Sequence, residues 1–159
     1  MKKDSHTKKI ITYGTFDLFH FGHVRLLQRM RALGDELHVG LSSDEFNNQK
    51  GKSCVIPYEH RKEVLLSCRY VDSVFPEESW DQKLTDIVNL GADIFAMGDD
   101  WSGKFDFLER EVKVIYLPRT EGVSTTELKM IVDAFNREKI YALQNMLESS
   151  LEHLKSIKL

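Results

Sequence analysis

The sequence is poor in the residues and runs that mark disulfide-stapled, metal-caged or membrane-spanning proteins. Its 159 residues include two cysteines, Cys54 and Cys68, whose spacing is neither a CxxC pair nor half of a recognisable metal site. No apolar run approaches the roughly 20 residues that cross a bilayer, and the polar start MKKDSHTKK lacks the apolar region of a secretory signal. We therefore expect two reduced thiols, no protein metal site, no membrane partner and a cytoplasmic location.

The charge balance lacks the basic excess of a general nucleic-acid-binding protein. The chain carries 22 Lys and Arg against 25 Asp and Glu, a net charge of -3, so no nucleic-acid partner is expected. Two nucleotide-binding patterns are also missing. No GxGxxG follows the first expected strand, and no GxxxxGK[ST] occurs, which disfavours a dinucleotide-dependent oxidoreductase and a P-loop kinase.

What the sequence does contain is a regular alternation of strand and helix signals. Runs rich in β-branched and aromatic residues predict strands over residues 9–13, 36–42, 71–75, 94–97 and 112–117. Helical patterns separate them, with a short helix before the last strand. Because strands that alternate with helices usually form a parallel sheet, we expect an α/β domain with helices on both faces of the sheet.

Capping signals and apolar spacing mark where the helices begin and end. The first helix is expected over residues 24–33, closed by Gly34, and the second follows Pro57. The residues expected on the buried side of the second helix are Val64, Leu65 and Cys68. A third helix is expected after a capping box of Ser79 and Gln82, ending at Gly91. Its expected buried residues are Leu84, Ile87 and Val88.

The junction between the first strand and the first helix holds the most informative segment, GTFDLFHFGH at residues 14–23. It places His20 and His23 three positions apart, on one face if the helix begins near His20. A helix N-terminus carries unpaired N–H groups and a partial positive charge, so it favours an anion. Gly22 has no Cβ and lets a ligand approach the backbone closely. The segment therefore predicts a phosphate-binding site.

The pattern GTFDxxHxGH, with a strand before it and a helix after it, resembles the signature of the cytidylyltransferase branch of the nucleotidyltransferase superfamily. Related adenylyltransferases carry Thr where this chain has His20. The first imidazole therefore favours the cytidylyl branch. This resemblance implies a Rossmann-like order of the strands.

A second strand-to-helix junction, YLPRTEGVSTT at residues 116–126, strengthens the resemblance. It is similar to the RTEGIST motif of the bacterial glycerol-3-phosphate cytidylyltransferase family, with Val123 in the Ile position. A capping box of Ser124 and Glu127 begins the following helix. Further similar segments, including DEFNNQKGK, YEHRK, RYVD, WDQK and MGDDWSGKFDF, extend the resemblance in order over residues 9–130.

The resemblance implies transfer of a cytidylyl group from CTP to glycerol 3-phosphate, giving CDP-glycerol and pyrophosphate. Mg²⁺ is expected to accompany CTP through phosphate oxygens and water. The acceptor phosphate has a second pKa of about 6, so its oxygen needs no general base at neutral pH. The enzyme must instead position two polyanions in line and compensate the charge on the leaving pyrophosphate. A pathway to teichoic-acid or capsule precursors and a homodimer are also implied.

The same resemblance carries roles onto matching positions of this chain. The residues implied to contact the triphosphate and act in catalysis are His20, His23, Lys52 and Arg119. The residues implied to bind the acceptor are Lys50, Lys83 and Arg69, with Arg69 and Asp72 expected as an ion pair. Lys50 and Lys52 are expected in a polar loop, and Lys83 on a helix that otherwise has a solvated face. Asp17 is expected to be structural. The residues implied to bind the nucleotide are Thr15, Phe16, Gly22, Arg61, Asp100, Trp101, Thr120, Glu121, Gly122, Val123, Ser124, Thr125 and Thr126. Among them, Asp100, Trp101 and Arg61 are expected to contact the cytosine.

Two other classes of function stay open at the level of sequence. One is the same chemistry on another acceptor, namely ribitol-, ethanolamine- or sugar-phosphate, or FMN with ATP. The other is a non-catalytic nucleotide-binding module that kept the fold. The matches at Lys50, Lys83 and the RTEG segment favour glycerol phosphate, and intact His20, His23 and Arg119 argue against the module.

The C-terminal tail lies beyond the resemblance. Residues 137–157 predict an amphipathic helix with a narrow apolar stripe made by Ile140, Leu143, Leu147, Leu151 and Leu154. The stripe could fold back on its own domain, but we favour contact with a second subunit, and the mixed charges disfavour a membrane surface. The expected organisation is a flexible N-terminus at 1–8, a cytidylyltransferase domain at 9–135 and a C-terminal helix at 136–159.

Overall fold

The computed structural model describes residues 6–156, with side chains described for residues 6–150, and divides into two compact units between Val123 and Ser124. The first unit is built on five strands: β1 (Lys9–Gly14), β2 (Glu36–Ser42), β3 (Ser73–Glu77), β4 (Ile94–Gly98) and β5 (Lys113–Leu117). Its helices are α1 (Phe21–Arg31), α2 (Asp44–Gln49), α3 (Tyr58–Leu66), α4 (Gln82–Leu90) and two short 3₁₀ turns, η1 (Asp99–Trp101) and η2 (Asp106–Arg110). The second unit contains α5 (Thr125–Ser156).

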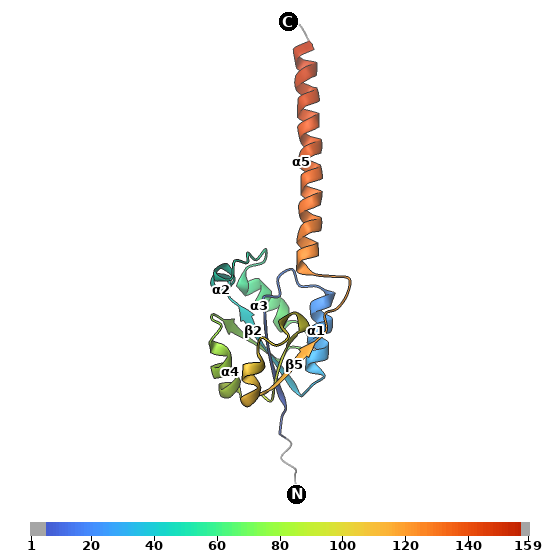
Figure 1. Ribbon diagram of the computed structural model, residues 1–159. Coiled ribbons are helices and arrows are strands. Elements are labelled where there is room, and N and C mark those ends of the chain that lie inside the picture. The colour runs from blue at the N-terminus through green and yellow to red at the C-terminus, as the bar shows by residue number, and fades with distance from the viewer. Residues whose placement is uncertain (1–5, 157–159) are drawn as a thin grey trace. The chain divides into compact units, whose positions relative to one another are not determined.

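The five strands form one parallel sheet in the order β3-β2-β1-β4-β5 (Figure 1). This confirms the expected Rossmann-like parallel sheet. The chain winds outward from β1 to β3, then returns to the other side of β1 with β4. In such sheets ligands bind beyond the carboxyl ends of the strands, where the order reverses. That point lies between the ends of β1 and β4.

Helices cover both faces of the sheet, as expected, and alternate side chains of each strand pack on opposite faces. On one face Ile10 and the alternate residues of β2 pack against α1 and α3 through Leu27 and Leu65. On the other face Ile11 and Phe95 pack against α4 and the 3₁₀ turns. These two apolar layers hold the strand ends rigidly, which fixes the positions of the loops that follow them.

The first helix departs from its expected bounds at both ends. α1 begins at Phe21, with His20 as its N-cap, and its C-cap is Ala32 in a right-handed conformation. Gly34 is therefore not the cap, and that prediction is wrong. A Cβ at Gly34 would lie 2.7 Å from the carbonyl oxygen of Lys8 and 2.4 Å from Cδ1 of Ile10. Glycine is required there by the close approach of the chain that enters β1.

The third strand, expected over residues 71–75, spans Ser73–Glu77 instead, because it begins two residues later and Pro76 lies inside it rather than ending it. β3 is an edge strand, paired only with β2, and a residue without an N–H is tolerated at an edge. The outward carbonyl of Pro76 accepts a hydrogen bond from Nε2 of Gln82 at 2.9 Å. The strand therefore continues to Glu77, which the sequence analysis did not single out.

The buried sides of α3 and α4 differ in part from the apolar pattern. Leu65 and Ile87 are buried as expected, whereas Val64, Leu84 and Val88 are exposed. Gln82 accepts from the N–H of Ser79 at 3.0 Å, but the helix starts at Gln82 with Asp81 as its N-cap and no side-chain cap. Gly91 closes α4 in the left-handed conformation (φ 64°), as expected. The segment before Lys50, expected as a loop, forms α2, which is capped by Ser43.

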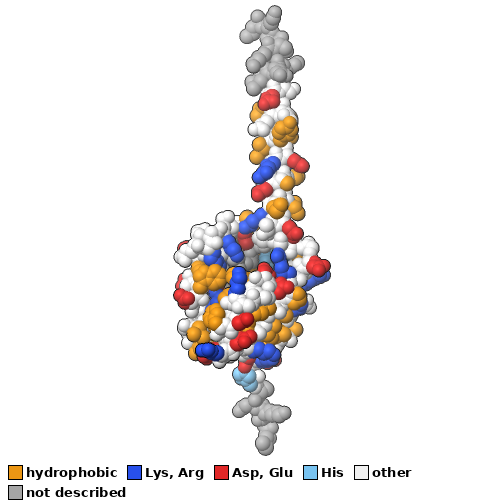
Figure 2. Space-filling model, in the orientation of Figure 1, with side chains coloured by type: hydrophobic (Ala, Val, Ile, Leu, Met, Phe, Trp, Pro, Cys, Tyr) orange, Lys and Arg blue, Asp and Glu red, His pale blue; other side chains and the backbone are white. Residues whose placement is uncertain are grey.

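The helix of the second unit begins where expected, since Oγ of Ser124 accepts from the N–H of Glu127 at 3.0 Å. α5 continues without a break to Ser156 and confirms the C-terminal helical extension. Figure 2 shows apolar and charged side chains interspersed along its surface. The proposed domain boundary between residues 135 and 136 falls inside α5 and stays a prediction. The flexible N-terminus also stays a prediction, because residues 1–5 lie outside the described residues.

Candidate active site

The two predicted histidines begin α1 as one hydrogen-bonded pair. The N–H of Gly22 donates to Nδ1 of His20 at 3.1 Å, and the N–H of His20 donates to Nδ1 of His23 at 3.3 Å. The rings stack with their centroids 3.8 Å apart. Because each Nδ1 accepts a hydrogen bond, each neutral ring carries its hydrogen on Nε2. The helix cap therefore sets the tautomer, and both histidines become Nε2–H donors.

The surroundings keep these imidazoles neutral. Burial lowers the pKa of His23 to about 3, with a further lowering by His20 and a smaller opposing effect of Asp17. Phe16 and Phe19 supply much of this apolar environment, with ring centroids 5.3 and 5.5 Å from that of His23. Burial and the nearby Arg119 guanidinium also lower the pKa of His20. The pair is suited to donating hydrogen bonds at neutral pH rather than to carrying charge.

The loop before the histidines is strained and anchored. Phe16 and Leu18 have positive φ angles of 49° and 47°, a conformation that costs a residue with a Cβ on the order of 1–3 kcal/mol. Asp17, between them, is 3% exposed. Its carboxylate accepts from the N–H groups of Val55 and Ile56 at 2.9 and 3.0 Å. These bonds offset the strain and support the expectation that Asp17 is structural.

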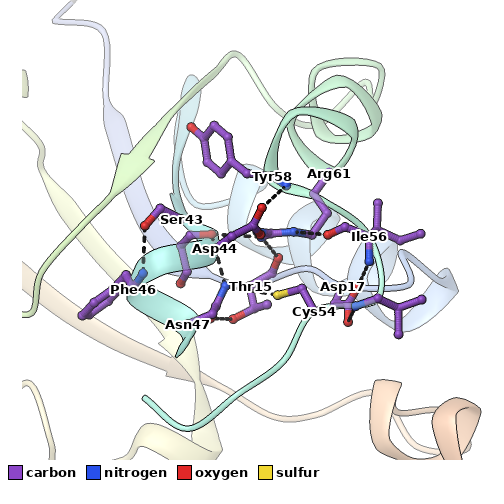
Figure 3. Close-up of polar contacts among 12 residues, drawn as sticks. Thr15, Asp17, Ser43, Asp44, Phe46, Asn47, Cys54, Ile56, Tyr58 and Arg61 are labelled. Atoms are coloured by element: carbon purple, nitrogen blue, oxygen red, sulfur yellow. Dashed lines mark hydrogen bonds and ion pairs between the residues drawn. The ribbon is translucent and has the colours of Figure 1, made fainter. Parts of the chain in front are cut away.

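Arg61 connects the ends of β1 and β2, and Figure 3 shows its side chain beside Asp44 and Ile56. Its side chain is buried, and its guanidinium donates to the carbonyls of Thr15, Ser42 and Ile56 at 2.7, 3.0 and 2.9 Å. It also donates to the Asp44 carboxylate at 2.6 Å. These bonds use four of its five N–H groups. The geometry therefore favours a structural role for Arg61 over the expected contact with a cytosine edge.

Thr15 and Asn47 complete this loop arrangement. Oγ1 of Thr15 donates to Oδ1 of Asn47 at 2.8 Å, and Nδ2 of Asn47 donates to Sγ of Cys54 at 3.3 Å. Both cysteines are free thiols, as expected. Asn47 is buried on α2 and was not identified from the sequence. Its signal was weak, because two successive Asn residues in a polar segment are typical of a loop.

The predicted acceptor lysines come together around a buried carboxylate at the end of β3. Nζ of Lys83 lies 2.5 Å from Oε1 of Glu77, and Nζ of Lys50 lies 3.7 Å from Oε2. Lys83 was expected on a solvated helix face but is 2% exposed. Sequence reasoning missed Glu77, and gave no role to Trp80, which lies beside both ammonium groups. Lys52 is exposed. Burial, followed by the charges of Lys52 and Lys83, lowers the pKa of Lys50, and Glu77 opposes this lowering.

The loops after β4 and β5 supply further predicted residues. Asp100 is exposed at the end of β4, and Trp101 packs against Trp80 and Phe105 with centroids 5.7 and 5.6 Å apart. Arg119, also exposed, lies near enough to His20 to affect its pKa. The structure therefore places these residues at the same edge of the sheet as the histidine pair.

Gly22 lies against a loop of the protein itself. A Cβ there would meet Cγ1 of Val123 at 2.8 Å and the His20 ring at 2.9 Å. Glycine is therefore needed for the approach of the loop that carries Val123, and the expected approach of a ligand stays a prediction. Oγ1 of Thr120 holds this loop to α1 by accepting from Arg29 at 3.2 Å. Gly122 turns it with a φ of 83°, beside the exposed Glu121.

Arg69 and Asp72 have other neighbours than the sequence suggested. Asp72 pairs with Arg31 at 3.1 Å, so the expected pair with Arg69 is wrong. Arg69 is exposed and lines, with Phe19, Val24 and Tyr70, a pocket of about 320 Å³. The contact between Arg31 on α1 and Asp72 is long-range and leaves no local signal. Ser124, Thr125 and Thr126 belong to the second unit, at the start of α5.

The site offers no protein cage for a metal ion. Within the described part of the chain, no group of three His, Cys, Asp or Glu side chains is placed to hold one. The Asp17 carboxylate is already bonded to backbone N–H groups. The residues present fit Mg²⁺ only if phosphate oxygens and water supply most of its ligands.

Among the helices of residues 6–156, none combines the length and apolar character that crossing a bilayer requires.

Comparison with known proteins agrees with this geometry. A family model described as cytidylyltransferase-like matches residues 11–140. The chain is 59% identical over 122 residues to the glycerol-3-phosphate cytidylyltransferase of Bacillus subtilis (strain 168), covering 77% of this chain and 95% of the relative. It is 55% identical to the enzyme of the same name from Staphylococcus aureus, covering 77% and 92%.

A solved structure supports the fold alone. The lipopolysaccharide core biosynthesis protein from Thermoplasma volcanium GSS1 superimposes with a TM-score of 0.62 and 22% identity. The match covers 72% of this chain and 99% of that one. The parallel sheet and its helices are therefore shared with a distant protein, whereas the closer sequence matches carry the family.

Proposed function

Since this chain belongs to the cytidylyltransferase-like family, we propose that it transfers a cytidylyl group from CTP to glycerol 3-phosphate, giving CDP-glycerol and pyrophosphate. The observation that carries the proposal is the neutral histidine pair at the start of α1, where the strand order reverses. Identity to curated glycerol-3-phosphate cytidylyltransferases over most of the chain supports the acceptor.

The proposed reaction is an in-line displacement at the α-phosphorus of CTP. An oxygen of the acceptor phosphate forms the new bond to the α-phosphorus, and the bond from that phosphorus to the bridging oxygen of the β-phosphate breaks. The bonding electron pair leaves on pyrophosphate. The acceptor oxygen is already deprotonated at neutral pH because its second pKa is about 6. The residues must therefore orient the two phosphates and stabilise the leaving group.

The residues divide this work by chemistry. Nε2–H of His20 and of His23 donates to the triphosphate, and the planar fork of Arg119 bridges phosphate oxygens. The ammonium of Lys52 compensates charge on the same triphosphate, while Lys50 and Lys83 hold the acceptor phosphate. Arg69 is proposed as a further acceptor contact. The nucleotide is held by Thr15, Phe16, Gly22, Asp100, Trp101 and the segment from Thr120 to Val123, with Arg61 ordering the loop.

Mg²⁺ is proposed to accompany CTP, held mainly by phosphate oxygens and water, and it supplies charge compensation when bound. We also propose that the protein works in the cytoplasm, where CTP is made, and supplies a precursor of teichoic acid or capsule.

A pyrophosphate-release assay with CTP across a panel of acceptors tests the function. We expect rapid release with glycerol 3-phosphate and little with ribitol 5-phosphate, phosphoethanolamine or a sugar phosphate. A parallel reaction with ATP and FMN covers the remaining alternative. Equal or faster turnover of another acceptor would overturn the substrate assignment. Release with none of them would indicate a nucleotide-binding module.

The base should be selected strongly. We expect kcat/KM for CTP to exceed that for ATP by at least about 10²-fold, because a pocket that pairs a cytosine edge leaves polar groups unpaired with a purine. Asp100→Ala should lower this preference by about tenfold, since one hydrogen bond to the cytosine amine is worth roughly 1–3 kcal/mol. Steady-state kinetics with both nucleotides measures the ratio.

The neighbouring Asp99→Ala is the matched control, because both exposed carboxylates begin η1. It should leave the CTP preference unchanged. If Asp100→Ala reduced kcat/KM equally for CTP and for ATP, Asp100 would lie outside the base pocket. Comparable kcat/KM for CTP and ATP in the unmodified protein would move the function toward the adenylyltransferases.

A homodimer is proposed from the family resemblance, with α5 as an added contact between subunits. Described apolar side chains along α5 are more than half exposed, including Ile140 (56%), Leu143 (58%) and Leu147 (64%). The side chains of Leu151 and Leu154, expected in the same stripe, lie outside those that the structure describes. Exposed apolar side chains at helical spacing favour burial against a second helix.

Truncation after Phe135 should therefore weaken self-association while the site in the first unit is retained. Sedimentation velocity over a range of protein concentrations measures the change. The full-length double variant Ile140→Gln with Leu147→Gln should act in the same direction, whereas Asn145→Ala, on the opposite side of the helix, should not. An unchanged oligomeric state and concentration dependence in the truncated chain would exclude α5 from assembly.

A further inference from the structure

A buried carboxylate joins the two lysines at the acceptor end of the site. Glu77 is the last residue of β3 and is 2% exposed. Oε1 accepts from Nζ of Lys83 at 2.5 Å, and Oε2 lies 3.7 Å from Nζ of Lys50. Ser42, the last residue of β2, donates its hydroxyl to Oε2 and accepts from Lys50 at 2.9 Å. One carboxylate thus holds two ammonium groups from α4 and the end of α2.

Aromatic rings enclose both ammonium groups. Nζ of Lys83 lies 4.5 Å from the ring centroid of Tyr13 and 4.8 Å from that of Trp80. Nζ of Lys50 lies 4.1 Å from the centroid of Phe46 and 5.5 Å from that of Trp80. Ring faces attract a cation but exclude water. The rings therefore hold the lysine side chains in position, but they do not supply the hydrogen bonds that a buried ammonium group loses with its water.

An ammonium group in such surroundings tends to lose its proton unless an anion is near. Burial, Lys52 and Lys83 lower the pKa of Lys50, and Glu77 opposes this lowering by its charge and a hydrogen bond. A neutral lysine would lose its charge attraction for a phosphate. With Glu77 ionised and both lysines protonated, the cluster keeps a net charge of +1 toward the acceptor.

We propose that Glu77 is a positioning residue for the acceptor, which keeps Lys50 charged and holds it with Lys83 at the carboxyl edge of the sheet. The assignment of an acceptor phosphate to these lysines rests on the proposed function. Glu77 acts through the lysines and needs no contact with substrate. Its role is distinct from a fold contact, because it sets the pH range over which the acceptor binds.

Two other titratable groups, Lys52 and Tyr13, face the lysines of this cluster. Lys52 faces Lys50 from the loop after α2 and disfavours its charged form. Tyr13 faces Lys83 from β1, and burial with Asp86 and Glu77 raises the pKa of its phenol. The phenol therefore stays neutral over the working range. Loss of the Glu77 charge leaves Lys50 beside two other cations, so its pKa must fall.

Glu77→Gln tests the proposal, because the amide keeps the shape and removes the charge. The KM for glycerol 3-phosphate should rise with increasing pH. In Glu77→Gln this rise should begin about one pH unit lower than in the unmodified protein. At alkaline pH the KM should be about tenfold higher. The KM for CTP should change by less than about twofold. Exposed Glu78→Gln is the matched control and should leave both unchanged.

A second measurement does not depend on turnover. Titration of Lys50 by NMR, in protein labelled at lysine and without substrate, should show the lower pKa in Glu77→Gln. If the unmodified protein failed to form CDP-glycerol, the proposed function would fall, and this titration would still decide the role of Glu77. An unchanged Lys50 titration, or equal rises of both KM values without a shift in pH, would overturn it.

A second variant covers the case in which Glu77→Gln does not fold. Ser42→Ala removes the hydroxyl between Lys50 and Glu77 while keeping the carboxylate. It should move the start of this rise in KM with pH in the same direction by a smaller amount, and Glu77→Asp should largely restore the original profile. An acceptor profile in Ser42→Ala that matched the unmodified protein would count against the proposal.

Discussion

Replacement of His23 by alanine should lower kcat by at least about 10²–10³-fold, because it removes a preorganised donor to the charge that develops on the leaving pyrophosphate. The ring accepts the N–H of His20, so its loss also removes one helix-capping bond. That bond is worth about 1 kcal/mol, too little to unfold the domain. Pyrophosphate release and thermal unfolding measured on the same preparation separate the two effects.

His60→Ala provides the matched control, since this histidine is exposed on α3 and should alter neither quantity. Near-normal turnover in His23→Ala would remove it from the catalytic machinery. The same comparison applies to His20 and Arg119. Arg119→Lys should also be impaired, because a single ammonium cannot reproduce the two parallel bonds of a guanidinium fork.

Replacement of Arg61 by methionine should destabilise the protein by on the order of 3 kcal/mol, because three backbone carbonyls lose a buried charged donor. Asp44, whose side chain is 40% exposed, can be solvated instead and contributes less of the loss. For a domain of this size the melting temperature should fall by roughly 6–12 °C. Differential scanning calorimetry measures it.

Arg69→Met makes the same chemical change at an exposed position and should stay within about 0.5 kcal/mol. The comparison also decides between two roles for Arg61. Unchanged stability with a reduced preference for CTP would return Arg61 to the cytosine edge, where the sequence placed it. Reduced stability with a retained preference in the folded fraction would support its role as a clamp between β1 and β2.

Local patterns predicted the elements well where the partner of each residue lies nearby. The histidines at positions 20 and 23 form a capping pair because helical geometry brings residues three apart together. Gly91 ends α4 because only glycine takes a left-handed conformation at little cost. The parallel sheet followed from strands that alternate with helices.

The pattern failed where a distant partner decided the outcome. Periodicity placed Lys83 in water, since a lysine is rarely buried unless it is paired. Lys83 is buried in the structure, because Glu77 forms an ion pair with its ammonium group and the rings of Tyr13 and Trp80 pack against it. In the same way Asp72 finds Arg31 on α1 rather than Arg69. These pairings join segments that only the folded sheet brings together.

The sequence by itself determined the family, the alternation of strands and helices, and the pair of imidazoles at a helix start, because each depends on residues close together in the chain. Only the tertiary structure decided the roles of Glu77 and Arg61, because each satisfies charges and carbonyls that come from other strands and loops. A buried charge is stable only where such partners converge. Their convergence is a property of the parallel sheet, whose strand ends all meet at one edge.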